Sequence, residues 1–503
     1  MNTRLNPISS GAFTIEAAAH LLRRAVIGIR PSEVASLHGL GLNAIVDELL
    51  QPIRVDVSAV QHLLSGVINS GVHPNDSPRS FDYFDEKAVH YTQFRQWICS
   101  TVIRSPVSLH MRMALMWHHH FPVSCNGAEY AEHTLDMFRG IMAESMGNIQ
   151  QLTKVITEST AMQIYLSGVQ NWWAEWGSGV NENHARELLE IHLLGRTNSK
   201  QVPLYSQRDI VNIARALTGN VTVRAWTNHG DGTRTNFRER ALHWEPSLWY
   251  TPMNEIFGVR GFFRAQDVID VIFQMRAKDV ALHFARRICT EFIGRRQELL
   301  PEDIEAVAEE LVRNNWDITL TMRTLLRSEM FYDERYRMRL VKSPLHLVLG
   351  AIRAFDAEYS PSVISDDHLR HTDLVRRLLA LGHLPFDPPN VSGWRSELEW
   401  LTPSDVNMRF DFCQRFGKGL IRRWDVFWEE PQFSYNPVQV AEKICNPRNA
   451  DLLVNSLVGT HLGTSSRDLI DELCFLVKSN PGASDTLRLV FTKVLSSPRY
   501  QLF

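Results

Sequence analysis

The chain has 503 residues, a formal net charge of −3 and 44% hydrophobic residues. A charge so close to zero gives no electrostatic case for nucleic acid or a polybasic membrane contact. No window approaches the roughly eighteen apolar residues of a membrane-spanning helix. The composition is therefore typical of an ordinary globular protein.

The six cysteines are scattered and none forms a C-x-x-C pair. This spacing excludes the zinc-ribbon, thioredoxin-like and c-type haem signatures and favours buried free thiols. The first residues, MNTRLNPISSGAFTIE, lack the charged start and unbroken apolar segment of a secretory signal. We therefore expect a cytoplasmic protein as the chain stands, or a periplasmic one if a leader has been removed.

Helical periodicity dominates the chain. Thr14 is a candidate N-cap for the first helix, and residues 31–52 predict two helices broken at Gly39 and Gly41 and ended by Pro52. The same period predicts further helices, in chain order, over residues 91–116, 131–146, 146–165, 181–194, 206–217, 266–292, 301–328, 340–355, 366–381, 404–423, 437–444 and 466–478.

Strand patterns are scarce. Residues 221–226 and 237–244 alternate on either side of the turn-rich 227–236, which predicts one hairpin. We predict a mainly α fold: a large helical-bundle-like domain over residues 1–423 with a small β insertion at about 220–250, and a C-terminal helical extension over 424–503.

Several ordered blocks together resemble the bacterial family known as domain of unknown function 1800. They are AAHLLRRAVIG (18–28), WHHHFPVS (117–124), NENHARELLEIHLLG (181–195), YSQRDIVNIARALTGN (205–220), and the pair LVKSPLHLVLGAIRAF (340–355) and LGHLPFDPPNVSGW (381–394). The resemblance implies no established reaction, cofactor or substrate. The chain is also distantly similar to bacterial families that sometimes carry fused cytochrome modules, which implies redox chemistry.

The chain departs from this family in three places. Members often read Trp-His-Asn-His-Phe where it has three histidines, and they often have Tyr at the position of His184. The tryptophan-rich NWWAEWGSG (171–179) looks peculiar to this branch. If that loop lines the site, the resemblance implies a different substrate from that of typical members.

The histidine triplet 118–120 is the strongest chemical signal. On a helix His118 and His120 diverge by about 200° and cannot share one ion. Pro122 disfavours helix at Phe121, so we expect the helix to end at the triplet. If the backbone is extended there, His118 and His120 converge while His119 points away. The alternative is structural: imidazoles that close a helix end and interact with its dipole.

The predicted helix 181–194 carries a second histidine. The 100° rule places His192 on the apolar face, with Ala185, Leu188 and Leu189. A buried imidazole needs a partner or stays neutral, so His192 is a candidate ligand; a hydrogen-bonded core histidine is the alternative.

Carboxylates follow the other side of the same helix. Glu187 is a candidate ligand or base, with Glu182 and Arg186 as further catalytic candidates. Pairs of Arg186 with Glu182 and Glu190 at i,i+4 spacing would instead only brace the helix. The helix has no Glu-x-x-His pair, so a di-iron bundle site is disfavoured.

Other candidates lie outside these two blocks. His243 and Glu245 share a face if extended, and His229 and Asp231 lie in the hairpin turn. The proline-rich segment 381–394 predicts a rigid clasp in which Asp387 and Trp394 are the functional candidates. Ser343 and Pro344 predict the N-cap and first position of a helix whose end could bind an anion.

The leading hypothesis is a metal-dependent enzyme, an oxidoreductase or oxygenase, acting on a small-molecule or peptide substrate. Its ligands would be His118, His120 and His192, with His243 as a further choice, holding iron or copper or else zinc. No nucleotide or haem signature occurs. One alternative is a metal-dependent hydrolase. The other is a non-catalytic helical scaffold whose Trp172, Trp173 and Trp176 dock a partner protein.

Overall fold

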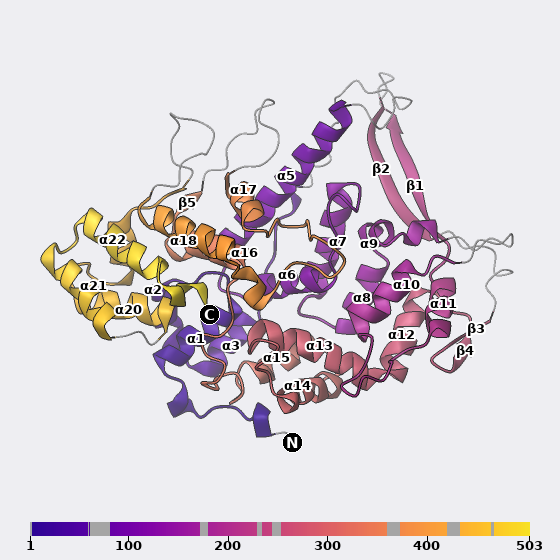
Figure 1. Cartoon of the computed structure of the whole chain (residues 1–503), viewed down its shortest axis with the longest axis horizontal. Helices are drawn as coiled ribbons and strands as arrows, with labels where there is room; N and C mark the ends of the chain where they lie inside the picture. Colours follow the sequence, from indigo (N-terminus) through magenta and orange to yellow (C-terminus); the bar gives the residue numbers. More distant parts are fainter. Residues whose placement is uncertain are drawn as a thin grey trace.

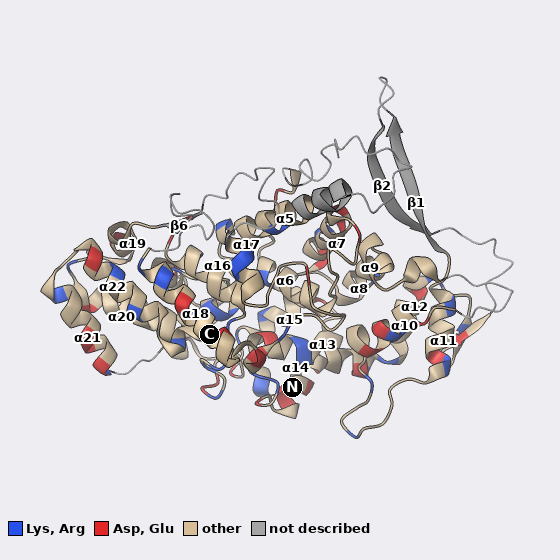
Figure 2. Cartoon of the chain, turned by 45° about the horizontal axis from the view of Figure 1, so that its top comes forward, with Lys and Arg blue, Asp and Glu red and all other residues tan. Residues whose placement is uncertain are grey.

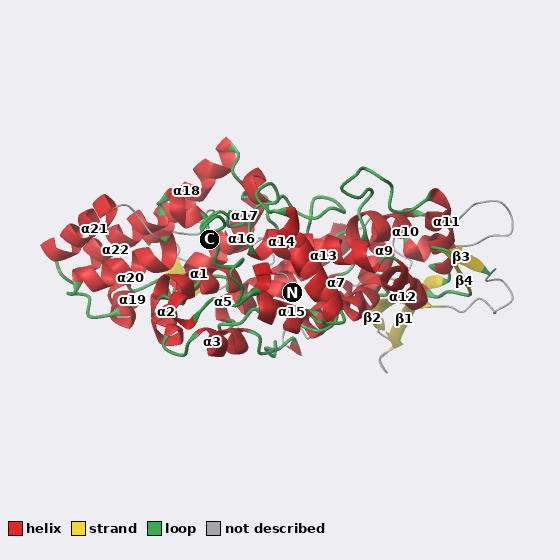
Figure 3. Ribbon diagram, turned by 90° about the horizontal axis from the view of Figure 1, so that it is seen from below, coloured by secondary structure: helices red, strands yellow, loops and turns green. Residues whose placement is uncertain are grey.

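The computed structural model describes residues 3–58, 60, 81–171, 180–228, 234–243, 253–359, 373–419, 433–463 and 467–503. Helices dominate it and the strands form three two-stranded sheets in these ranges, so the predicted mainly α fold is confirmed. Figure 1 shows an elongated molecule with α20, α21 and α22 at one end and α8 to α12 near the other. In Figure 3 the β1–β2 and β3–β4 hairpins are both found toward this second end.

The N-terminal helices follow their sequence signals. Thr14 caps α1, because its hydroxyl accepts a hydrogen bond from the Ala17 N–H. The predicted helix pair appears as α2 and α3, separated at Gly39 and Gly41. The bounds are α1 Ile15–Ala25, α2 Pro31–His38 and α3 Leu42–Leu49.

The prediction of a single helix over residues 91–116 is wrong. The structure has α5, Phe81–Arg104, then a break, then α6, His110–His120. Pro106 explains the break, because proline disfavours helix at the preceding residue. The next helices are α7 Ala131–Glu144, α8 Ile149–Thr157, α9 Thr160–Tyr165, α10 Asn183–Glu187 and α11 Gln207–Ala216.

The helix predicted over 181–194 changes its geometry halfway. After α10 the chain continues as a π-helix, Leu188–Leu193, whose wider turn departs from the 100° rule. The apolar face predicted for Ala185, Leu188, Leu189 and His192 is nevertheless buried. Leu194, which directly follows the wider turn, is buried as well.

The second half of the chain completes the helical body. Pro301 and Pro344 each stand in the first turn of a helix, where their missing N–H costs nothing. The bounds are α12 Ala265–Met275, α13 Ala277–Phe292, α14 Pro301–Arg313, α15 Ile318–Leu325, α16 Pro344–Ala354, α17 Asp373–Ala380, α18 Pro403–Gly417, α19 Pro437–Ile444, α20 Ala450–Leu462, α21 Arg467–Ser479 and α22 Ser484–Leu495.

The predicted hairpin is present. Strands β1, Asn220–Asn228, and β2, Arg234–His243, pair antiparallel, with an irregularity between Trp226 and Thr227. Two smaller antiparallel pairs were not predicted, because strands of two or three residues leave no alternation to detect. They are β3 Asn254–Ile256 with β4 Val259–Gly261, and β5 Glu358–Tyr359 with β6 Phe433–Ser434.

One hydrophobic cluster runs through the molecule, from Phe13 near the start to Tyr500 near the end. Residues of both predicted units therefore pack in a common core, while the proposed boundary at 423/424 stays a prediction. Among the described helices, none combines the length and apolar character needed to cross a lipid bilayer.

Candidate functional site

A pocket of about 600 Å³ opens between α6, the π-helix, α13, the start of α16 and the segment 383–400. This volume lies within the usual range of small-molecule sites. All three histidines of the triplet line it, together with His283, His346 and His383. The pocket therefore gathers the conspicuous histidine block with residues from distant parts of the sequence.

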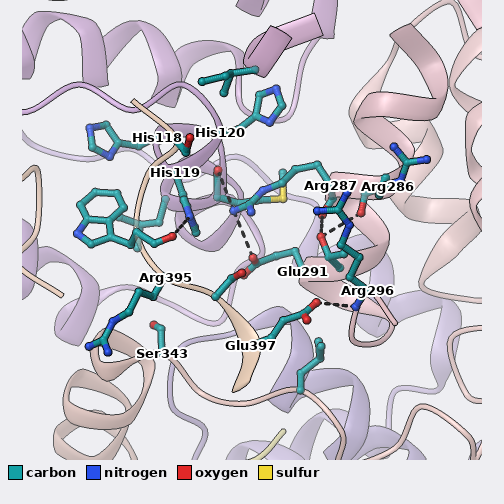
Figure 4. Close-up of a pocket in the computed structure, with 18 of the residues that line it drawn as sticks. His118, His119, His120, Arg286, Arg287, Glu291, Arg296, Ser343, Arg395 and Glu397 are labelled. Atoms are coloured by element: carbon teal, nitrogen blue, oxygen red, sulfur yellow. Dashed lines mark hydrogen bonds and ion pairs between the residues drawn. The ribbon is translucent and has the colours of Figure 1, made fainter. Parts of the chain in front are cut away.

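The triplet adopts the last turn of a helix. α6 continues through His120 and ends at Phe121. The prediction of an extended backbone, in which the side chains of His118 and His120 would converge, is therefore wrong. Figure 4 shows these two imidazoles pointing to opposite sides, with His119 between them and directed into the pocket. The residue expected to point away is thus the one that faces the cavity.

The predicted metal ligands do not form one set in this arrangement. The His118 ring packs on Phe386, with ring centroids 4.4 Å apart. The His120 Nε2 donates to the His192 carbonyl at 2.8 Å, and the rings of these two residues are 6.5 Å apart. Among the residues whose side chains are described, no three His, Cys, Asp or Glu side chains come close enough to hold a metal. His118, His120 and His192 therefore do not form one metal-binding set in the described part of the chain.

His119 is held in one tautomer. Its Nε2 lies 3.1 Å from the Trp394 carbonyl, which can only accept, so Nε2 carries the proton and Nδ1 the lone pair. Gly393 makes this contact possible: a Cβ there would lie 2.5 Å from His119 Cδ2. The segment 381–394 therefore acts as the predicted clasp, and it orients a histidine.

Burial keeps His119 uncharged. Burial first, and then the charges of Arg287 and His383, hold the pKa of His119 well below its ordinary value. Burial likewise lowers the pKa of His283 to about 4 and that of His383 to about 3. These imidazoles are neutral at pH 7, so the predicted attraction of imidazolium to the α6 dipole does not arise, and His119 keeps the lone pair on its Nδ1.

Arginines give the pocket its charge. Its lining has twice as many arginines as glutamates: Arg112, Arg196, Arg286, Arg287, Arg296 and Arg395 against Glu190, Glu291 and Glu397. Figure 4 shows Arg286, Arg287 and Arg296 gathered on one side and His119 and Arg395 on the other. Blue and red segments are interspersed along the described helices in Figure 2, so the cationic excess belongs to the pocket.

The pocket glutamates are already engaged. Glu291 pairs with Arg112 at 3.2 Å and with Arg287 at 3.6 Å. Glu190 pairs with Arg196 at 2.6 Å, and Glu397 accepts the Arg296 backbone N–H. Within the described part of the chain, the guanidinium groups of Arg286 and Arg296 have no carboxylate partner. Two exposed cations therefore remain at this pocket.

An aromatic wall faces the arginines. Trp394 lies against His118, His119 and His383, with ring centroids 5.0 to 5.7 Å apart. Trp400 stacks on His383 at 5.3 Å and carries the Arg395 guanidinium 4.9 Å from its ring. The prediction that Trp394 belongs to a functional site agrees with its place in this lining, whereas Asp387 pairs with Arg95 at 3.3 Å.

The predicted catalytic residues of the 181–194 helix lie outside the lining. Arg186 pairs with Glu182 at 2.9 Å and with Glu190 at 3.5 Å, as in the bracing alternative. Glu187 is half-buried; burial, followed by the charge of Glu190, raises the pKa of its carboxyl. None of these three candidates is among the pocket residues, although Glu190 is.

Some predictions fall outside what the structure describes. His243 ends β2, but its side chain is not described. His229, Asp231, Glu245 and the Trp172, Trp173 and Trp176 loop also lie outside the described residues.

Sequence reasoning missed Arg287, His283 and His383 as members of the site. His383 lies within the block LGHLPFDPPNVSGW, whereas Arg287 lies in ARRICTEFIG (285–294). Their charge and imidazole groups were not recognised because no local spacing joins them to the triplet.

Comparison with known proteins gives one match. The family model described as "Protein of unknown function (DUF1800)" matches residues 20–502. A search of curated proteins and a search of solved structures each returned no match.

Proposed function

Because the chain belongs to the DUF1800 family of proteins of unknown function, whose description states no reaction, we propose a function from the pocket itself. The protein is an enzyme that binds an anionic small molecule between its arginines and its aromatic wall. His119 transfers a proton at the reacting group. The observation that carries this proposal is His119, neutral and fixed in one tautomer, in the same pocket as Arg287.

The charge of the pocket supports an anionic ligand. Arg286 and Arg296 lack carboxylate partners in the described chain, and Arg287 shares Glu291 with Arg112. Guanidinium groups bind carboxylate and phosphate in a planar, two-point geometry. Trp394 and Trp400 add aromatic rings to the same lining. The ligand chemistry that fits both sides is an anionic head on an aromatic or apolar body.

The reaction supported best is attack of water on a phosphoryl or acyl group. The Nδ1 lone pair of His119 would take a proton from the attacking water and return it to the leaving group. Negative charge that develops on the reacting oxygens would be stabilised by Arg287, whose own charge helps to keep His119 neutral beforehand.

Binding and turnover can be tested separately. We expect phenyl phosphate to bind the purified full chain, and Arg287→Met to weaken that binding by about tenfold or more. Arg139→Met, a substitution of an exposed arginine on α7, should leave it unchanged. Calorimetric titration measures both, and equal affinities of the two variants would contradict the assignment.

The rate of hydrolysis tests whether His119 acts as the base. His119→Gln keeps a neutral N–H donor for the Trp394 carbonyl but loses the base, so hydrolysis of a phenyl ester should fall about 10²-fold to 10⁴-fold. Binding of phenyl phosphate should persist. If the variant hydrolyses the ester at the rate of the unmodified chain, His119 is not the base.

The metal-dependent oxidoreductase or hydrolase, and the scaffold, stay predictions. Metal analysis of protein purified without a His-tag tests the first two, with alanine at His118, His120 and His192. Metal content that is unchanged in those variants would remove the predicted ligands. Chelator-independent stability together with co-purification of a partner would favour the scaffold.

A further inference from the structure

A second, much smaller cavity lies behind the pocket. It has a volume of about 30 Å³ and lies between α1, the start of α16, α20 and the segment 500–503. Arg112, His346 and Phe503 line both cavities and so separate them. Because the volume matches about one water-sized particle, no substrate of the main pocket fits there.

The wall of this cavity carries only one sign of charge. Arg23, Arg112 and Lys342 line it together with the neutral imidazoles of His346 and His461, and none of the lining residues is an Asp or a Glu. Arg112 reaches Glu291 on its other side, at 3.2 Å. Within the described part of the chain, Arg23 and Lys342 have no carboxylate partner at all.

Lys342 is the least compensated of these groups. Its Nζ lies 3.7 Å from the centroid of the Tyr500 ring, and the other charges that act on it include the cations Arg23 and Arg409. Burial first, with these cations, lowers the pKa of Lys342 to about 7. An ammonium group in such surroundings is costly unless an anion accompanies it.

Two buried nitrogen atoms at the same cavity also lack partners. Arg23 uses its Nη1 on the carbonyls of Gly459 and Thr460, at 2.9 and 2.8 Å, but its Nε has no partner in the described chain. The His461 Nε2 is buried and equally unpaired among the described atoms. Arg23 and His461 are 8% and 4% exposed, so these two nitrogen atoms are buried without a partner in the described chain.

We propose that a single halide ion of the size of chloride occupies this cavity, held between Lys342, Arg23 and His461. The small volume favours a monatomic anion over the larger sulfate or phosphate. It would supply the missing negative charge and accept from the Lys342 ammonium and the Arg23 Nε–H. This site is independent of the proposed activity of the main pocket.

The ion would join parts of the chain that are far apart in sequence. Arg23 comes from α1, Lys342 precedes α16, and His461 lies on α20. Loss of the ion would leave these three elements held together around uncompensated charge. We therefore expect halide to stabilise the folded chain beyond the general effect of ionic strength.

The test uses the full chain in chloride-free gluconate buffer. Added chloride or bromide at constant ionic strength should raise Tm by about 1 °C or more and saturate, since an ion that binds only the folded state stabilises it. Sulfate should not reproduce this effect. Crystals grown with bromide should show an anomalous peak within about 4 Å of Lys342 Nζ, the reach of a close ionic contact.

Lys342→Met is the matched variant, because it keeps the length of the side chain and removes its charge. It should lose the halide-dependent part of Tm, while Lys200→Met, at an exposed position, should retain it. If Lys342→Met does not fold, the bromide peak in the unmodified chain still decides. A Tm that is indifferent to halide, or a bromide peak only in the main pocket, overturns the proposal.

Discussion

The position of His119 depends on a residue without a side chain. Gly393 has a φ of +89°, and its Cα approaches the end of α6 so closely that a Cβ would lie 2.8 Å from the His119 carbonyl oxygen. Contacts under 3.0 Å require something to shift, and here the obstacles are backbone and a packed ring. The neighbouring Trp394 carbonyl could not otherwise reach His119 Nε2.

Gly393→Ala should therefore be strongly destabilising. We expect a loss of about 2 to 4 kcal/mol, the sum of a left-handed backbone and a steric clash. The displaced His119 should also slow turnover. Denaturant unfolding measures the first effect and a kinetic assay of the proposed ester hydrolysis the second.

Gly258→Ala is the control for the backbone contribution. Gly258 has a similar φ of +82°, and a Cβ there would meet nothing within 4 Å. The free energy of unfolding of Gly258→Ala should fall by about 1 to 2 kcal/mol, and its turnover should not change. Equal losses for the two variants would show that the contact with His119 does not constrain Gly393.

At the scale of residues, the sequence indicated a histidine block that lines the pocket, but it directed His119 away from the cavity. The helix rule states that His118 and His120 diverge on a helix, and they do. The extended alternative rested on Pro122, but Pro122 restricts only Phe121, which is the C-cap. What His119 faces depends on Gly393 and Trp394, about 275 residues away, and no local pattern contains that information.

At the scale of secondary-structure elements, residues at helix ends form part of the pocket lining. The N-cap of α16 is Ser343, whose hydroxyl accepts from the His346 N–H at 3.3 Å and lies 3.0 Å from His346 Nδ1. Both residues line the main pocket, and Lys342 directly precedes them. This cap, predicted from the Ser-Pro pair, therefore fixes the side chains between the two cavities.

Ser343→Ala should cost about 1 kcal/mol through loss of the cap and should free the His346 ring. Because that ring lines the pocket, the affinity for phenyl phosphate should also fall, by up to about tenfold. Thermal unfolding and calorimetric titration measure the two effects.

Ser159→Ala offers the comparison. Ser159 caps α9 by accepting from the Met162 N–H at 3.3 Å, and it is remote from the pocket lining. We expect a similar loss of stability and no change in affinity. If both variants bind phenyl phosphate as the unmodified chain does, the α16 cap is structural only.

Element boundaries were predictable where the signal was chemical and local. Thr14, Ser343 and the Gly39–Gly41 pair each mark an observed end. The π-helix at Leu188–Leu193 was not predictable, because apolar periodicity does not distinguish a turn that is wider by one residue.

Across the whole molecule, many imidazoles are buried in their neutral form. Burial, joined by nearby cations at His461 and His283, lowers the pKa of His118, His192, His383 and His461 to about 3, and that of His184 and His283 to about 4. His184 is an extreme case, since both of its ring nitrogens are buried without a partner in the described chain. The fold therefore tolerates these groups only while they remain unprotonated.

This arrangement fixes the sign of the pH dependence. Between pH 6.5 and about 4 the unfolded chain binds protons on these histidines, whereas the folded chain does not. The free energy of unfolding should therefore be largest above pH 6.5 and fall as the pH decreases. Carboxylates whose pKa is lowered, such as Asp356 and Asp405, add to the same slope only near the lower end of this window, because their pKa in the unfolded chain is near about 4.

Calorimetry at pH 5.5 in buffers of different ionisation enthalpy should accordingly detect uptake of several protons on unfolding. His184→Leu should reduce that uptake by about one proton and flatten the pH slope by about 1.4 kcal/mol per pH unit. It should also raise stability at pH 7 by about 1 kcal/mol or more, because an unsatisfied polar ring leaves the core.

His110→Leu should instead destabilise at pH 7, since the His110 ring accepts from the Ile53 N–H and donates to the Met142 carbonyl. A Tm that does not change between pH 7 and 5, with no proton uptake, would mean that these imidazoles have hydrogen-bonding or solvent access that their burial denies.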